Sequence, residues 1–131
     1  MMALDTNVLV RFLVEDDPQQ TKRAKSVFKK AVEEKQNLFI SDVVLCELMW
    51  VLRSCYRISK MEMVQIVRRL ALTKQIILAP SDECGKALDC FETGRGDFAD
   101  YLILQKALLA GCTSVVTFDE SLLKESKFAR P

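Results

Sequence analysis

The stretch LFISDVVLCELMWVLRSCY, residues 38–56, joins a short and mostly apolar run to a longer segment whose apolar residues have helical spacing. A brief apolar run of this kind is typical of a strand that is covered on both faces. Three similar runs occur at residues 1–4, 76–79 and 114–117, and helical segments separate them. The alternation predicts a three-layer α/β/α fold around a parallel sheet of four strands. The usual doubly wound order is 3-2-1-4.

The helical segments carry their own start and stop signals. Asp17 and Pro18 have the residue types of an N-cap and a first helical position, and Ser59 with Glu62 forms a capping box. Gly111 is suited to end the last long helix. The predicted helices cover residues 17–35, 42–56, 59–72, 81–93 and 97–111.

Length and composition limit the classes of protein. The chain has 131 residues, half of them apolar, which fits a single domain over residues 1–131. No apolar run is long enough to span a membrane and no signal segment is present, so we expect a cytoplasmic protein without a membrane partner. The five cysteines include no C-x-x-C pair, and we expect buried thiols rather than disulfides or a zinc site.

The chain contains no histidine and has a formal net charge of +1. The absence of histidine excludes Ser-His-Asp and Cys-His catalysis, H-E-x-x-H zinc sites and an imidazole general base. Any catalysis must therefore depend on carboxylates. The balanced net charge neither indicates nor excludes a nucleic acid partner, because a local basic patch is sufficient to bind one.

Five acidic residues follow predicted strands or open the helices beside them. These residues are Asp5, Glu47, Asp97, Asp100 and Asp119. The carboxyl ends of parallel strands form the edge of the sheet where such folds bind ligands. Two carboxylates about 4 Å apart at an effective dielectric of about 20 repel each other by about 4 kcal/mol, so a cluster requires a counter-ion. An all-oxygen set suits Mg²⁺ or Mn²⁺.

Each of these acids also has a local explanation. Asp5 can cap a short helix over residues 7–13, Asp97 can be an N-cap with Asp100 at N3, and Asp119 can cap a helix over residues 120–126. Glu47 can be a solvated helix residue. The metal site is favoured by the joint placement of the acids at one edge of the sheet, because no single acid indicates it alone.

Four blocks of sequence carry a resemblance to a known family. They are LDTNVLVRFL at residues 4–13, SDVVLCELMWVL at 41–52, DFADYLIL at 97–104 and VVTFD at 115–119. In this order and spacing, the chain resembles the PIN-domain ribonucleases, and among them the VapC-type toxins of toxin–antitoxin pairs. The resemblance implies the PIN fold, in which a fifth edge strand is common, giving the order 3-2-1-4-5. No such strand is evident in this sequence.

The resemblance also implies roles for individual residues. Asp5, Asp100 and Asp119 correspond to metal ligands, Glu47 corresponds to the second catalytic acid, and Asp97 corresponds to an auxiliary acid. The polar residues expected to orient these ligands are Thr6, Asn7 and Thr117. Turn and cap chemistry explains those three equally well.

The implied activity is Mg²⁺- or Mn²⁺-dependent endonucleolytic hydrolysis of RNA, which leaves a 5′-phosphate and a 3′-hydroxyl. The implied partners are RNA, a second copy of the chain and a cognate antitoxin. Two rival functions stay open. A haloacid-dehalogenase-like phosphatase also has an aspartate after its first strand, but its motif requires a second aspartate where this chain has Asn7. A PIN domain that binds RNA or a partner without cutting is the other rival.

An acidic site must be accompanied by cations that hold the RNA backbone. Arg11 and Arg95 are the candidates, because each lies close in sequence to a predicted catalytic aspartate. A second group of five cations lies on the first long helix: Lys22, Arg23, Lys25, Lys29 and Lys30. We expect this group to form a solvated face that is balanced by Glu33 and Glu34.

Overall fold

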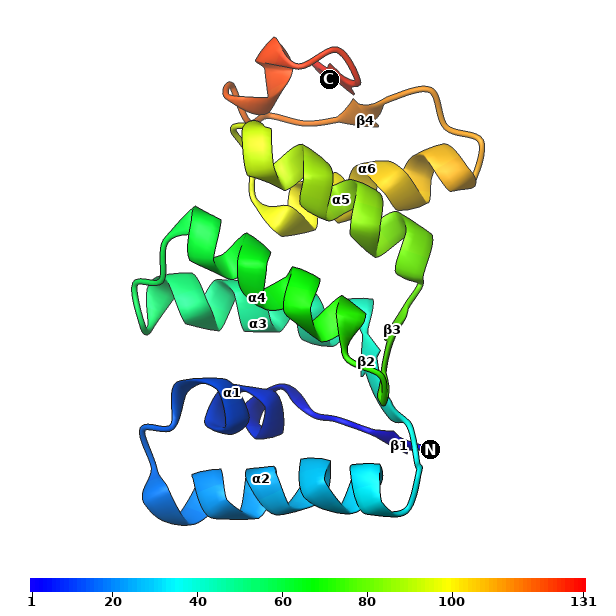
Figure 1. Cartoon of the computed structure of the whole chain (residues 1–131). Helices are drawn as coiled ribbons and strands as arrows, with labels where there is room; N and C mark the ends of the chain where they lie inside the picture. The colour runs from blue at the N-terminus through cyan, green and yellow to red at the C-terminus, as the bar shows by residue number, and fades with distance from the viewer. The chain divides into compact units, whose positions relative to one another are not determined.

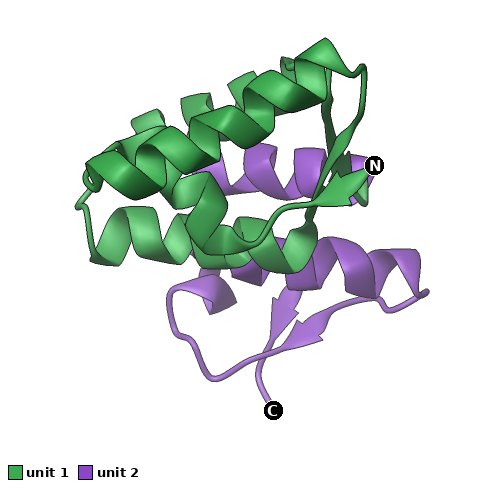
Figure 2. Ribbon diagram, turned by 90° about the horizontal axis from the view of Figure 1, so that it is seen from below, with its two compact units in different colours: residues 1–80 green, residues 81–131 purple.

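The computed structural model describes residues 1–131, which form two compact units. Unit 1 is Met1–Pro80 and unit 2 is Ser81–Pro131 (Figure 2). Each unit has its own strands and its own helical pairs, and each is described by itself. That the two units form a single domain stays a prediction.

Unit 1 contains a parallel sheet of three strands. The strands are β1 (Met2–Ala3), β2 (Leu38–Ser41) and β3 (Ile76–Ala79), with β2 in the centre. Leu38 of β2 is paired with Met2 on one side and with Ile76 on the other. The sheet confirms the predicted α/β class and the strand order 3-2-1. The parallel pairing explains why helices separate the apolar runs, because a helical crossover must return the chain to the same end of the sheet.

Four helices accompany this sheet: α1 (Thr6–Val14), α2 (Pro18–Glu33), α3 (Asp42–Ser54) and α4 (Lys60–Leu72). Figure 1 shows them as two antiparallel pairs, α1 with α2 and α3 with α4. The predicted caps are formed, since a carboxylate oxygen of Asp17 accepts the backbone N–H of Gln20 at 3.0 Å and Oγ of Ser59 accepts that of Glu62 at 3.2 Å. The helix boundaries therefore follow from local capping chemistry.

The core of unit 1 is made by the inward faces of these elements. Leu38 and Ile40 of β2 are fully buried, as alternate residues of a central strand should be. From the helices, Leu9, Leu45 and Leu48 are also fully buried. Each such side chain contributes about 1.5–3 kcal/mol through its removal from water. The rings of Phe12 and Phe28 stack with centroids 3.8 Å apart and join α1 to α2.

Unit 2 contains α5 (Ser81–Thr93), α6 (Phe98–Leu109), β4 (Val115–Val116), the 3₁₀ turn η1 (Leu122–Lys124) and β5 (Phe128–Ala129). Helices α5 and α6 form a third antiparallel pair (Figure 1). The backbone of α6 ends as predicted, because Gly111 has a φ of 94° and Cys112 N–H donates to the carbonyl of Ala107 at 2.9 Å. This is a Schellman C-cap.

The fifth edge strand that the family resemblance left open is present, because β5 pairs in parallel with β4, Val115 facing Phe128. The sequence hides this strand because it is two residues long and only Phe128 gives it a strong apolar signal. The helix expected over residues 120–126 is a single 3₁₀ turn. That the first and fourth strands are neighbours in one sheet stays a prediction.

The cysteines also differ from expectation. All five are free thiols, but only Cys84 is fully buried, while Cys55 and Cys112 are exposed. Both exposed thiols follow the last turn of a helix, where the chain is at the surface. None of the helices is both long and apolar enough to cross a bilayer.

Two glycines provide a matched test of the backbone. Gly111→Ala should lower the free energy of unfolding by about 1 kcal/mol, because a φ of 94° is costly for a residue with a Cβ atom. Gly85→Ala should raise it by about 0.5–1 kcal/mol, because Gly85 is in the middle of α5 and no atom lies within 4 Å of an added Cβ. Urea denaturation of the two variants and the wild type measures both changes. Equal shifts in the same direction would contradict the assigned conformation of Gly111.

Candidate active site

The first predicted catalytic residue, Asp5, lies in unit 1 two residues after the end of β1. Asp5 takes the N-cap position of α1, but its carboxylate forms no capping hydrogen bond. The side chain is exposed to solvent. The local explanation of Asp5 as a side-chain cap is therefore absent from the structure, and its oxygens are available to a ligand.

One hydrogen bond joins Glu47 to the N-terminal end of α1, next to Asp5. The hydroxyl of Thr6 donates to Oε2 of Glu47 at 2.5 Å, and the two residues are 41 positions apart in sequence. Thr6 is buried, whereas Glu47 is exposed. Because Thr6 follows Asp5 directly, the bond restrains a second acid near the first turn of α1. Asn7, the next residue, is exposed and lines a pocket beside α1.

In unit 2, Asp97 and Asp100 lie together in the first turn of α6. Asp97 holds the N-cap position, and its backbone N–H donates to Oδ2 of Asp100 at 2.8 Å. The predicted pairing of an N-cap with an acid at N3 is therefore present. It places two carboxylates at the positive end of the helix dipole, which partly offsets their repulsion.

The pKa of Asp100 is raised above its ordinary value. Burial of the carboxyl is the largest cause, and the charges of Asp97, Asp119 and Glu125 add to it, while the hydrogen bond from the Asp97 backbone opposes it. The side chains that shift this pKa are all acidic. Negative charge therefore accumulates around Asp100 at the start of α6.

Asp119 follows β4 and is held by the turn that comes after it. Its Oδ1 accepts the backbone N–H of Ser121 at 2.9 Å and the Ser121 hydroxyl at 2.6 Å. These bonds lower the pKa of Asp119. Oγ1 of Thr117 accepts the backbone N–H of Asp119 at 3.1 Å. Asp119 therefore stabilises the turn that follows it, and this local role occupies one of its two carboxylate oxygens.

Glu125 is an acid near this group that the sequence did not indicate. A carboxylate oxygen of Glu125 accepts the Tyr101 hydroxyl at 2.7 Å and the Arg95 backbone N–H at 3.4 Å. The same hydroxyl accepts the Gly96 N–H at 2.9 Å, and burial together with Glu125 raises the pKa of Tyr101 to about 12. The sequence could have indicated Glu125 only if the pairing of β4 with β5 had been recognised. That pairing brings the tail of the chain back to β4.

The loop over residues 94–96 is shaped by these contacts. A Cβ at Gly94 would collide with the Tyr101 hydroxyl, and one at Gly96 would collide with Leu122 and come within 3.0 Å of Oδ2 of Asp100. Glycine at both positions therefore lets Tyr101, Glu125 and Asp100 approach the loop closely. The exposed Arg95 between them extends into solvent beside Asp97.

The predicted acids are divided between the two units. Asp5 and Glu47 belong to unit 1, and Asp97, Asp100 and Asp119 belong to unit 2. Within either unit, no three acidic or thiol side chains come close enough to hold a metal ion. Convergence of all four principal acids therefore stays a prediction. The carboxylates present are oxygen donors of the kind that Mg²⁺ and Mn²⁺ accept, so the residue types fit such an ion.

The two predicted RNA contacts differ in their surroundings. The guanidinium of Arg11 donates from Nη1 to Asp16 at 3.1 Å and to Tyr56 at 3.3 Å, and from Nε to Gln20 at 2.6 Å. The Tyr56 hydroxyl donates to Asp16 at 2.6 Å, which lowers the pKa of Asp16. Arg11 is therefore part of a structural network in unit 1, whereas the side chain of Arg95 is exposed.

The chain is similar to known proteins. Residues 2–127 match the PIN domain family, and the chain belongs to that family. A relative from Aquifex aeolicus described as a VapC ribonuclease is 23% identical over 124 residues, which cover 95% of this chain and 91% of the relative. A chain of a toxin–antitoxin complex from Klebsiella pneumoniae is 18% identical with a TM-score of 0.35, covering 98% of this chain and 96% of that chain.

The raised pKa of Asp100 predicts the effect of removing its charge. A carboxyl whose folded pKa is raised stabilises the fold at low pH, and this stability is lost as the pH rises through the folded pKa. Without metal at pH 7, Asp100→Asn should therefore raise the melting temperature by a few degrees, because asparagine keeps an oxygen that accepts the Asp97 N–H.

The gain should shrink as the pH falls from the raised pKa of the folded carboxyl towards 3.8, its ordinary pKa, and should be lost below that value. Asp82→Asn is the control, because it removes the same charge from the first turn of α5 and should lower the melting temperature slightly or not at all. Thermal melts from pH 3 to pH 8 measure both variants. A variant that is less stable than the wild type at pH 7 would refute the assigned repulsion.

Proposed function

We propose that the protein is a metal-dependent endoribonuclease that acts as the toxin of a toxin–antitoxin pair. The observation that carries the proposal is the accumulation of carboxylates around Asp100 in a chain that belongs to the PIN family. Repulsion among charges that face the start of one helix is a cost that a bound cation offsets. The similarity to a VapC ribonuclease supports RNA as the substrate.

In this proposal Asp5, Asp100 and Asp119 hold Mg²⁺ or Mn²⁺. Such an ion, when bound, lowers the pKa of a water molecule and stabilises charge on phosphate oxygens. Glu47 orients the attacking water or a second ion, and Asp97 assists either group. Thr6 restrains Glu47 through its hydroxyl, and Thr117 supports the backbone of Asp119. Tyr101 and Glu125 keep the 94–96 loop in place next to Asp100.

The exposed position of Arg95 supports a contact with the substrate backbone. Its side chain lies in a loop beside Asp97, so a phosphate near the acids is within the reach of an arginine. The charge of Arg11 is already compensated by Asp16, which makes Arg11 the weaker candidate. The phosphatase alternative is not retained, because the chain belongs to the PIN family and carries Asn7 where the phosphatase motif has aspartate.

We also propose self-association and an antitoxin partner. One face of α3 is buried, through Leu45, Leu48, Met49 and Leu52, but Val43 and Trp50 are 63% and 65% exposed. These residues are seven positions apart and share one face of α3. An exposed tryptophan beside a valine is typical of a contact surface. The antitoxin is proposed from the resemblance of the motifs to VapC-type toxins.

Cleavage of RNA tests the proposed activity directly. Purified protein freed of any antitoxin should cut structured RNA with Mg²⁺ or Mn²⁺ present, and EDTA should abolish the cleavage. Asp5→Ala and Asp100→Asn should each lower the rate at least a hundredfold, because each removes a ligand from the reacting centre. Products should carry a 5′-phosphate. Intact RNA with every metal would leave the non-catalytic PIN domain as the function.

Metal binding is measured separately by thermal stability. Mg²⁺ should raise the melting temperature of the wild type, because a ligand that binds the folded state stabilises it. Asp100→Asn should show no such rise. Asp82→Asn should keep the rise, since its carboxylate is in the first turn of α5. Identical melts of the wild type with and without metal would contradict the site.

A further inference from the structure

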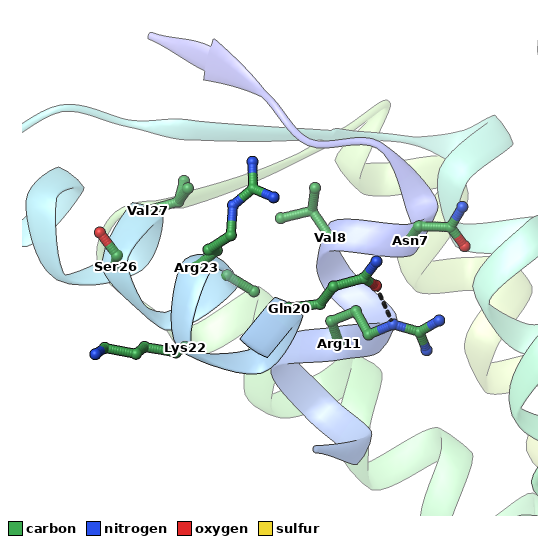
Figure 3. A pocket seen from close by; sticks show the side chains of 9 residues that line it. Asn7, Val8, Arg11, Gln20, Lys22, Arg23, Ser26 and Val27 are labelled. Atoms are coloured by element: carbon green, nitrogen blue, oxygen red, sulfur yellow. Dashed lines mark hydrogen bonds between the residues drawn. The ribbon is translucent and has the colours of Figure 1, made fainter. Parts of the chain in front are cut away.

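A pocket with a volume of about 600 Å³ lies between α1 and α2 of unit 1. All its lining residues belong to these two helices, so it is independent of unit 2. Figure 3 shows Asn7, Val8 and Arg11 on the α1 side, with Gln20 and Arg23 extending from α2. The catalytic proposal does not use this pocket, although α1 begins immediately after Asp5.

The charges that line the pocket are all positive. Arg11, Lys22 and Arg23 contribute side chains, and no carboxylate is among the lining residues. The ion pair between Arg11 and Asp16 at 3.1 Å compensates the first charge. Lys22 and Arg23 have no ion pair or hydrogen bond, so their two charges are uncompensated.

The other cations of α2 are different in this respect. Lys29 and Lys30 are 3.8 Å from Glu33 and Glu34 respectively, and Lys25 pairs with Glu15 at 2.5 Å. The expected balance with glutamates therefore holds for Lys29 and Lys30 but is wrong for Lys22 and Arg23. The reason is helical spacing, because a glutamate four positions later pairs with only two of the five cations.

Apart from the hydroxyl of Ser26, the remaining lining groups are apolar or amide. Val8, Ala24 and Val27 present aliphatic surface. Asn7 and Gln20 present amide groups of the kind that pair with base edges, and the oxygen of Gln20 already accepts Arg11 Nε. Unpaired bases of RNA offer flat apolar faces and hydrogen-bonding edges, and the backbone offers phosphates for cations. A nucleotide uses all three kinds of lining group at once.

We propose that this pocket binds a nucleotide of single-stranded RNA next to the cleaved bond, with Lys22 and Arg23 holding its phosphates. The position supports this assignment, because Asn7 lines the pocket and is two residues after Asp5. The inference rests on the proposed ribonuclease function and deepens it. An acidic peptide would satisfy the two cations but would leave the base-pairing amides without a specific partner.

The double variant Lys22→Ala/Arg23→Ala tests the inference, with Lys29→Ala/Lys30→Ala as the matched control. The control removes the same charge from the same helix, at residues that pair with glutamates. Affinity for a labelled single-stranded RNA is measured by fluorescence anisotropy in EDTA, so that no cleavage occurs. Salt concentration is varied to count the phosphate contacts.

Each phosphate contact to a single strand contributes about 0.7 to the slope of log K against log salt, or about fivefold in affinity at 0.1 M salt relative to 1 M. The pocket variant should therefore lose roughly 25-fold in affinity at 0.1 M salt, and its slope should fall by about 1.4. In the cleavage assay with metal its KM should rise while kcat is unchanged, because the lost contact is uniform binding. The control should match the wild type.

Other outcomes overturn the inference in distinguishable ways. If the wild type cuts RNA but the pocket variant has the affinity, slope and KM of the control, the pocket is not an RNA subsite while the proposed function stands. If the pocket variant instead loses only the binding of a labelled polyglutamate peptide, the pocket serves an acidic protein partner. If the wild type neither binds nor cuts RNA, the proposed function and this inference fail together.

Discussion

Repulsion among carboxylates at the start of α6 is the constraint on which the proposed chemistry depends. The fold holds Asp100 in a partly buried position and brings the charges of Asp97, Asp119 and Glu125 to bear on it. The hydrogen bond from the Asp97 backbone keeps the carboxylate oriented although ionisation is disfavoured. An ionised carboxylate at position 100 therefore lowers the stability of the fold relative to a neutral side chain. A bound cation would offset this cost.

The same loop shows how structure and charge are linked. The Tyr101 hydroxyl connects the Gly96 backbone to Glu125, 24 residues later, and this connection requires glycine at position 94, where a Cβ would collide with the hydroxyl. In unit 1 the hydrogen bond from Thr6 to Glu47 has a comparable role, since it joins the first turn of α1 to α3. In both units, therefore, a hydroxyl restrains a carboxylate that is distant in sequence.

The cations of α2 fall into two groups with different surroundings along one helix. Its C-terminal lysines pair with glutamates one turn later, so they stabilise the helix only slightly, by about 0.2–0.5 kcal/mol for each pair. Its N-terminal cations face a pocket that also contains amide and aliphatic groups. Uncompensated charge beside a concave surface raises the local concentration of a polyanion, whereas paired charge does not. The two groups of cations on α2 therefore differ in their partners and not in their residue types.

The sequence by itself determined the elements whose causes are local. Strands β2 and β3 and the starts of α2 and α4 follow from apolar runs and from caps that act over three residues, such as Ser59 with Glu62. The order 3-2-1 followed from the usual strand order of doubly wound folds, and the acids of the PIN motifs were visible as residue types. Only the tertiary structure decided the contacts between distant segments, namely the β4–β5 pair, the position of Glu125 and the uncompensated charge of Lys22 and Arg23. The physical reason is range, because a cap is specified within one helical turn, whereas a bond between Tyr101 and Glu125 depends on how the whole unit packs.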